Sequence, residues 1–293
     1  MSTHSTVRVG YVVSGSQKAG TTSLALLLRH HPHLAPAPVK EWHYFDDESR
    51  RWAEHDFADY SVPRTDPRQV MAGDATPLYL WWPQALERMH RYDPALRHIV
   101  LVRDPIERLV SQWQMISNRW PAEAVSWARF LTRFAPDPAE VPQPQRPPRT
   151  NVHAFRMHSG VVRGYYGAQL RHGIEVFGRE AFLVLDMREL IADHVATVHR
   201  VTDHLGLPRL DDVPSLPHGM KGKPALSPDR PTVEQIAGLV ERYAPDLELF
   251  AELSGVDVSA WSTCAVADGR LSVEEFTARL TTRFAAPAHA AAP

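Results

Sequence analysis

The chain has 293 residues, enough for one large α/β domain or two small ones, and its net charge of −2 excludes a general binder of polyanions such as nucleic acids. Its one cysteine, Cys264, excludes an intramolecular disulfide and a cysteine-rich metal site. The sequence has no apolar run of about 18 residues, and its first ten residues lack an apolar signal core. We therefore expect a cytoplasmic protein that makes no membrane contact, in which any anion site is a local cluster of charge.

Hydrophobic patterning predicts strands that alternate with helices along the chain. Buried strands are expected at three stretches rich in β-branched or other apolar residues, 7–14, 97–103 and 181–186. Each is followed by a stretch with helical spacing of its apolar residues: 22–30, 106–118 and 187–205. This alternation predicts an α/β fold with a central parallel β-sheet and helices on both of its faces.

The proline-rich stretch 134–149 interrupts this pattern. Its prolines exclude a core helix or strand, so an extended surface segment is expected. Such a segment is either a passive loop or part of a lid over a binding site. We expect one domain over residues 7–283 with this stretch as an insertion, followed by a disordered tail at 284–293.

The stretch VVSGSQKAGTTSL, residues 12–24, is close to a phosphate-binding loop but has its lysine in a different place. The loop of nucleotide triphosphatases, G-x-x-x-x-G-K-[ST], carries its lysine directly after the second glycine. Here Gly15 and Gly20 have the right spacing, but Thr21 stands in the lysine position and Lys18 lies inside the loop. Backbone N–H groups and the hydroxyls that follow could still surround one phosphate group at the start of a helix.

Metal-dependent phosphoryl transfer is disfavoured by the same region. No aspartate clearly ends an apolar strand in a position to hold magnesium, because Asp104 follows an arginine and precedes a proline. A small-molecule kinase of P-loop ancestry is therefore an alternative that the order of residues in the loop opposes.

Four segments together resemble the sulfotransferases that use 3′-phosphoadenosine 5′-phosphosulfate (PAPS), and most closely their heparan-sulfate glucosaminyl sulfotransferase branch. They are GSQKAGTT (15–22), KEWHYFD (40–46), GDATPLY (73–79) and IVLVRDPIERLVSQW (99–113). The stretches 165–190 and 219–223 also fit, so the resemblance runs from about residue 10 to Trp261. Each segment alone is weak evidence, whereas their order and spacing together are specific. The resemblance implies a P-loop-like fold and PAPS as the donor, with no metal required.

The resemblance also implies two anion sites, because PAPS carries a 5′-phosphosulfate and a 3′-phosphate. The loop after the first strand corresponds to the 5′-phosphosulfate site, and Arg103 and Ser111 correspond to the 3′-phosphate site, for which a planar guanidinium is suited. The stretch 219–223 is similar to a loop that closes over the nucleotide. The expected donor-binding residues are Ser16, Gln17, Lys18, Ala19, Gly20, Thr21, Thr22, Ser23, Arg103, Ser111, Lys221, Gly222 and Lys223.

The expected catalytic residues lie in the loop and in KEWHYFD. Sulfuryl transfer builds negative charge on the bridging oxygen of the leaving phosphate, and Lys18 at the loop tip can neutralise it. Glu41 and His43 are expected to share one face of an extended segment. The resemblance makes Glu41 the general base, with His43 as the alternative base or as a group that orients the acceptor. Lys40 is expected to contact the sulfate or the acceptor, and Asp46 to support Lys40 or His43.

The sequence indicates only a broad class of acceptor. The arginines within 119–163 are scattered and form no long basic groove for an anionic polysaccharide, and aromatic residues lie near them. We therefore expect transfer to a hydroxyl, with an amine as the less favoured alternative, of a small and partly apolar metabolite or glycan. Ala75 departs from the branch, in which many animal members have a lysine there.

Two further expectations concern the context of the protein. A chain rich in Ala, Arg and Pro is typical of GC-rich bacteria, where such enzymes often act in specialised metabolism. A non-catalytic nucleotide-binding module is a second alternative function. The presence of Glu41 together with Lys18 and Arg103 opposes it, since a binding module needs no base.

Overall fold

The computed structural model describes residues 5–135, 152–216 and 229–282. The chain divides into two compact units, one made of Met1–Arg103 and Gln169–Gly219 and the other of Asp104–Ala168 and Met220–Pro293. Three sequence predictions lie outside the described residues: most of the proline-rich stretch, the donor-loop residues Lys221, Gly222 and Lys223, and the tail 284–293.

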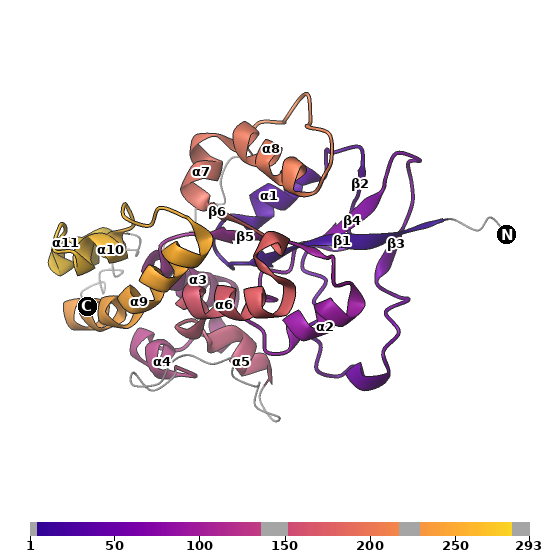
Figure 1. Cartoon of the computed structure of the whole chain (residues 1–293). Coiled ribbons are helices and arrows are strands. Elements are labelled where there is room, and N and C mark those ends of the chain that lie inside the picture. The colour runs from indigo at the N-terminus through magenta and orange to yellow at the C-terminus, as the bar shows by residue number, and fades with distance from the viewer. Residues whose placement is uncertain (1–4, 136–151, 217–228, 283–293) are drawn as a thin grey trace, which may run out of the picture. The chain divides into compact units, whose positions relative to one another are not determined.

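The first unit is built around a sheet with the strand order β2, β4, β1, β5, β6 (Figure 1). The strands are β1 (Thr6–Gly15), β2 (Leu34–Ala35), β4 (Met71–Asp74), β5 (Arg97–Val102) and β6 (Phe182–Asp186). Each neighbouring pair in this order runs parallel. A short strand, β3 (Ser61–Pro63), pairs antiparallel with the first residues of β1. The three strands expected from the sequence correspond to β1, β5 and β6, which are neighbours in this sheet, so that prediction is confirmed.

Helices cover both faces of the sheet in this unit. Figure 1 shows α1 (Thr21–Leu28), α7 (Met187–Ala192) and α8 (His194–His204) on one side, with α2 (Ala85–Tyr92) and the end of α6 (Tyr166–Phe177) on the other. The first side is held by an apolar cluster that joins helix residues such as Leu24 and Val198 to strand residues such as Ile99. On the second side His98 of β5 lies against Phe177 of α6, with 4.4 Å between ring centroids. The expected α/β class, with a parallel sheet flanked by helices, is confirmed.

Two details of the first unit differ from the sequence predictions. The single helix expected over 187–205 is broken at Asp193, because the Asp193 side chain accepts a hydrogen bond from the Ala196 N–H group (2.9 Å) and starts a new helix. The second detail concerns aspartates at strand ends, since the sequence predicted none in a position to hold magnesium. Asp186 ends β6 and Asp74 ends β4. Arg188 binds the Asp186 carboxylate, since its backbone N–H group (2.8 Å) and its guanidinium (2.6 Å) both donate to Asp186.

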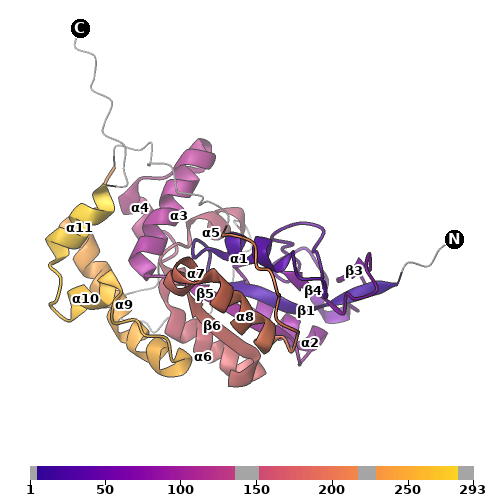
Figure 2. The ribbon, with the colours of Figure 1, turned by 90° about the horizontal axis from the view of Figure 1, so that it is seen from above.

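The second unit is helical in the part that the structure describes. Its helices are α3 (Pro105–Arg119), α4 (Trp127–Thr132), α5 (Val152–His158), α9 (Val233–Ser254), α10 (Ser262–Ala267) and α11 (Val273–Thr281). The helix expected at 106–118 is α3, and it begins where the Asp104 side chain accepts from the N–H groups of Ile106 and Glu107 (3.0 and 2.9 Å). The long helix α9 packs against α10 and α11 (Figure 2). Among the described helices, none combines the length and the apolar character needed to cross a membrane.

Candidate functional site

Predicted site residues follow the carboxyl ends of three adjacent parallel strands, β4, β1 and β5. The end of β1 at Gly15 continues into the loop with Lys18, and the end of β5 at Val102 is followed directly by Arg103. β4 ends at Asp74, in the GDATPLY segment. Ligands of open α/β sheets bind at this edge, so the topology alone brings three segments that are distant in sequence to one place.

The loop between β1 and α1 is a tight turn that leads into an open helix N-terminus. The Ser16 N–H group donates to the Leu101 carbonyl (2.5 Å) and the Ala19 N–H group to the Ser16 carbonyl (3.1 Å), which fixes the loop on the sheet. Gly20 precedes the helix with φ at 90°, a backbone conformation that strains any other residue. In the described part of the chain no side chain caps α1, and its first turn has no acidic residue. Its first N–H groups therefore favour an anion.

The two predicted donor subsites meet in the first unit. The Arg103 guanidinium donates a hydrogen bond to the Lys18 carbonyl (3.4 Å), so the residue after β5 lies against the tip of the loop after β1. Lys18 itself is half-buried. Of the other predicted loop residues, Ser16, Ala19 and Thr21 are buried, whereas Gln17, Gly20, Thr22 and Ser23 are half-buried. Ser111 belongs to α3 of the second unit, and its role stays a prediction.

The KEWHYFD segment is not extended, and the prediction that it would be is wrong. Glu41 and His43 both have left-handed backbones, with φ at 60° and 55°. Tertiary hydrogen bonds hold this shape, because three consecutive N–H groups donate to side chains of the GDATPLY segment. Trp42 donates to Asp74 Oδ1 (3.4 Å), His43 to Thr76 Oγ1 (3.2 Å) and Tyr44 to Tyr79 Oη (2.9 Å). KEWHYFD and GDATPLY, which both carry the resemblance, are thus held together by these hydrogen bonds.

Asp74 is the centre of this arrangement. Its buried carboxylate accepts from the hydroxyls of Tyr60 (2.8 Å), Tyr79 (2.5 Å) and Thr76 (2.7 Å). Burial raises the pKa of Asp74, although these hydroxyl donors oppose the rise. The role of Asp74 was not predicted, although its segment carries part of the resemblance. The signal available was the spacing of acidic, hydroxyl and phenolic residues at 74, 76 and 79.

Four polar side chains of KEWHYFD form a continuous chain. Lys40 pairs with Glu41, the Glu41 carboxylate lies 3.7 Å from His43 Nε2, and His43 Nδ1 lies 2.8 Å from Asp46 Oδ2. Lys40, Glu41 and His43 keep about a third of their side-chain surface exposed (33%, 30% and 32%), whereas Asp46 is fully buried. A ligand can therefore reach the first three. Of the two supporting roles expected for Asp46, the structure shows the contact with His43.

The charge state of Glu41 follows from this chain of contacts. Burial alone would raise the pKa of Glu41, but the His43 side chain 3.7 Å away and the charge and hydrogen bond of Lys40 outweigh it and lower the pKa to about 2. Glu41 is therefore ionised at neutral pH, as a base must be. A carboxylate with so low a pKa is also a weak base, and it gains basicity when a ligand draws Lys40 or His43 away from it.

Backbone conformation singles out the same residues independently. Among the described residues, six that are not glycine have positive φ, and three of these are Lys18, Glu41 and His43. A left-handed backbone is unfavourable for residues with a side chain and persists where the surrounding structure imposes it, often at binding and catalytic sites. Lys18 in the loop and Glu41 and His43 in KEWHYFD therefore have a backbone conformation that is typical of functional sites.

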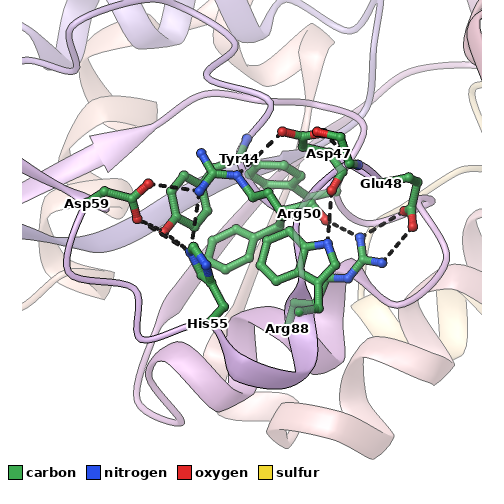
Figure 3. A network of polar contacts seen from close by, with 11 residues as sticks. Tyr44, Asp47, Glu48, Arg50, His55, Asp59 and Arg88 are labelled. Carbon is green, nitrogen blue, oxygen red and sulfur yellow. Dashed lines mark hydrogen bonds and ion pairs between the residues drawn. The ribbon is translucent and has the colours of Figure 1, made fainter.

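A network of aromatic and charged residues fixes the chain that follows KEWHYFD (Figure 3). Arg50 lies over the Tyr44 ring, 3.9 Å from its centroid, and donates to Asp59 (2.8 Å). The Arg88 side chain on α2 is 7% exposed and donates to both carboxylate oxygens of Glu48 (2.8 Å each) and to the Phe45 carbonyl (2.7 Å). Sequence reasoning missed this network, because nothing in the spacing of Arg88 relates it to residues 40 positions earlier.

Replacing Arg88 with methionine should lower the free energy of unfolding by about 1–3 kcal/mol, because it leaves the carbonyl of the buried Phe45 without its donor and leaves the Glu48 carboxylate with the Trp82 N–H group as its remaining donor. Urea unfolding followed by fluorescence measures the change. The matched control is Arg209→Met, which breaks an exposed ion pair with Asp203 and should cost less than about 1 kcal/mol. Equal effects of the two variants would remove the special role given to Arg88.

Comparison with known proteins gives one family. A profile of the sulfotransferase domain matches residues 10–218. Heparan sulfate glucosamine 3-O-sulfotransferase 6 from Homo sapiens is 29% identical over 201 residues, which cover 68% of this chain and 52% of that protein. Heparan sulfate glucosamine 3-O-sulfotransferase 3B1 from Homo sapiens is 29% identical over 203 residues, covering 68% of this chain and 46% of that protein. The chain thus spans about half the length of the curated relatives that it matches.

A solved structure supports the fold. The crystal structure of a sulfotransferase from Alicyclobacillus acidocaldarius superposes with a TM-score of 0.64 at 24% identity, over 87% of this chain and 99% of that one. The similarity to sulfotransferases therefore holds for the fold as well as for the sequence segments.

Proposed function

The chain belongs to the sulfotransferase family, and we propose that it moves a sulfuryl group from PAPS to a hydroxyl of its acceptor. The observation that carries the proposal is the contact between the two predicted donor subsites, in which Arg103 donates to the Lys18 carbonyl beside the open N-terminus of α1. A donor with two separate anionic groups needs two such subsites.

The residues present fit this donor. The α1 N-terminus, with its first N–H groups and the hydroxyls of Thr21, Thr22 and Ser23, suits the 5′-phosphosulfate. Arg103 suits the 3′-phosphate, with Ser111 as the second ligand that the resemblance assigns. Ser16, Gln17, Ala19 and Gly20 would serve through the backbone of the loop. Lys221, Gly222 and Lys223 keep the proposed role of closing over the nucleotide.

The proposed reaction needs one base and one group that stabilises the leaving phosphate. The acceptor oxygen forms a bond to sulfur while the bond from sulfur to the bridging phosphate oxygen breaks, and 3′-phosphoadenosine 5′-phosphate (PAP) leaves. Lys18 would neutralise the charge that builds on the bridging oxygen. The acceptor proton would pass to Glu41, once the contact with Lys40 or His43 has loosened.

A hydroxyl acceptor is the favoured form of this proposal. The two relatives described above are named as 3-O-sulfotransferases, which act on an oxygen. A small metabolite or a glycan could carry such a hydroxyl. A role in the cytoplasm, a place in bacterial specialised metabolism and a domain that extends over 7–283 belong to the same proposal.

Binding of PAP should raise the melting temperature without added magnesium and in the presence of a chelator. A ligand that binds only the folded state adds about 2.7 kcal/mol of stability at a hundredfold excess over its dissociation constant. Adenosine 5′-phosphosulfate, which lacks the 3′-phosphate, should stabilise much less, and Arg103→Met should reduce the difference between the two ligands. Equal shifts from both ligands on the unsubstituted protein would remove the role of Arg103.

A further inference from the structure

A cavity of about 60 Å³ lies in the first unit, between α1 and the strands β1, β2 and β4. Its walls are mostly apolar, and the apolar side chains that form them include Val13, Leu28, Leu34, Ala35 and Ala75. Apolar walls of this kind fit a hydrocarbon group and offer little to a charged one.

One part of the cavity lining is polar, and it includes residues already placed in the site. Thr22, in the first turn of α1, Lys40, the ion-pair partner of Glu41, and Asp74 line the cavity, as does Arg29 at the end of α1. The cavity therefore adjoins the proposed donor loop on one side and the proposed base on the other. The hydroxyl that accepts a sulfuryl group must lie between those same two groups.

Two exposed apolar side chains line the same cavity, so it is open to solvent on that side. Leu26 and Val39 line it and are 40% and 53% exposed. They are two of the five large apolar residues that are exposed in the described part of the chain. Exposed apolar side chains that cluster at a cavity mark a binding site more often than scattered ones do.

The size of the cavity limits the group that fits. An apolar cavity of about 150 Å³ binds benzene, so about 60 Å³ corresponds to a short aliphatic chain of roughly two to four carbons.

We propose that this cavity binds a short aliphatic part of the acceptor, and so selects an alcohol whose hydroxyl lies a few carbons from an apolar end. The inference rests on the proposed function, and it adds the class of acceptor to it. The apolar end fills the space beside Leu34 and Ala75, which leaves the hydroxyl at the polar part of the lining, near Lys40 and Glu41.

The test has a binding arm that does not depend on turnover. With methyl-labelled protein saturated with PAP, 1-butanol should shift the NMR signals of Val13, Leu28 and Leu34. Ala75→Leu and Ala37→Leu both place bulk in the lining, and each should abolish these shifts while PAP still raises the melting temperature. Unmoved methyl signals in the unsubstituted protein, or full shifts in both variants, overturn the inference.

The second arm measures transfer of labelled sulfuryl from PAPS to alcohols of increasing length. From ethanol to 1-butanol, kcat/KM should rise about threefold or more per added methylene, and Ala75→Leu should flatten the series. Val39→Ser should lower kcat/KM for 1-butanol, whereas Val70→Ser, at a similarly exposed valine outside the cavity (58% against 53%), should not. A flat series, or no transfer to 1-butanol, overturns the assignment. Absence of any PAP-induced stabilisation would instead contradict the proposed donor, and the butanol shifts would still report on the cavity.

Discussion

Glu41→Gln should lower turnover by roughly 10²–10⁴, the usual contribution of a positioned general base, while PAP still binds. The glutamine keeps the shape and much of the hydrogen bonding of Glu41 and removes its basicity. An alcohol does not ionise unaided near neutral pH, so no second route replaces the lost base. Single-turnover transfer from PAPS measures the chemical step, and the PAP-induced rise in melting temperature serves as the control for binding.

The pH profile separates Glu41 from His43 as the base. Because the pKa of Glu41 is about 2 in the ligand-free protein, the carboxylate stays ionised as the pH falls to well below neutrality. If Glu41 is the base, kcat/KM should therefore lack an acidic limb between about pH 5 and pH 8, where a histidine base would produce one. Substantial turnover of Glu41→Gln, combined with an inactive His43→Ala, would transfer the role to His43.

Lys18→Ala should weaken donor binding and slow the chemical step, by roughly 10²–10³ for the latter, since it removes a positive charge from the leaving phosphate. This pattern differs from that of Glu41→Gln, which should spare donor binding. Titration with PAP gives the dissociation constant, and single-turnover transfer gives the rate. Lys18→Arg is the matched variant, because it keeps the charge, and it should recover part of both losses. A Lys18→Ala protein with unchanged PAP binding and rate would show that the loop does not hold the phosphosulfate.

The predictable part of the fold is local in origin. Strands such as β1 and β5 are buried on both faces, so their apolar runs stand out in the sequence, and the Gly15 to Gly20 spacing marks the turn between β1 and α1. The break at Asp193 depends on a side chain that competes for backbone N–H groups, which apolar periodicity does not register. The short strands β2 and β3 have two and three residues, too few for any periodicity.

The candidate site divides in a similar way. Lys18, Glu41 and Arg103 were predicted from motifs, and their roles stay predictions. The contact of Arg103 with Lys18 follows from the parallel order of β1 and β5. The shape of KEWHYFD was mispredicted, because the hydrogen bonds that hold it come from Asp74, Thr76 and Tyr79, more than 30 positions later. An alternating pattern predicts an extended segment only where no such distant partner intervenes.

The cavity beside Lys40 could not be predicted from the sequence at all. Its apolar walls come from three strands and a helix, and each of those residues alone has the pattern of ordinary core. Only the packing of α1 over β2 and β4 leaves the space between them open.

The most direct test of sulfuryl transfer is a mass-spectrometric assay of hydroxyl acceptors, incubated with PAPS and a metal chelator. We predict that an alcohol acceptor gains the mass of one sulfuryl group, that PAP forms in equal amount, and that both products fall together in Glu41→Gln. A parallel incubation with ATP and magnesium should give no phosphorylated product. Phosphorylation in that incubation, with no sulfated product from PAPS, would contradict the account and favour a kinase.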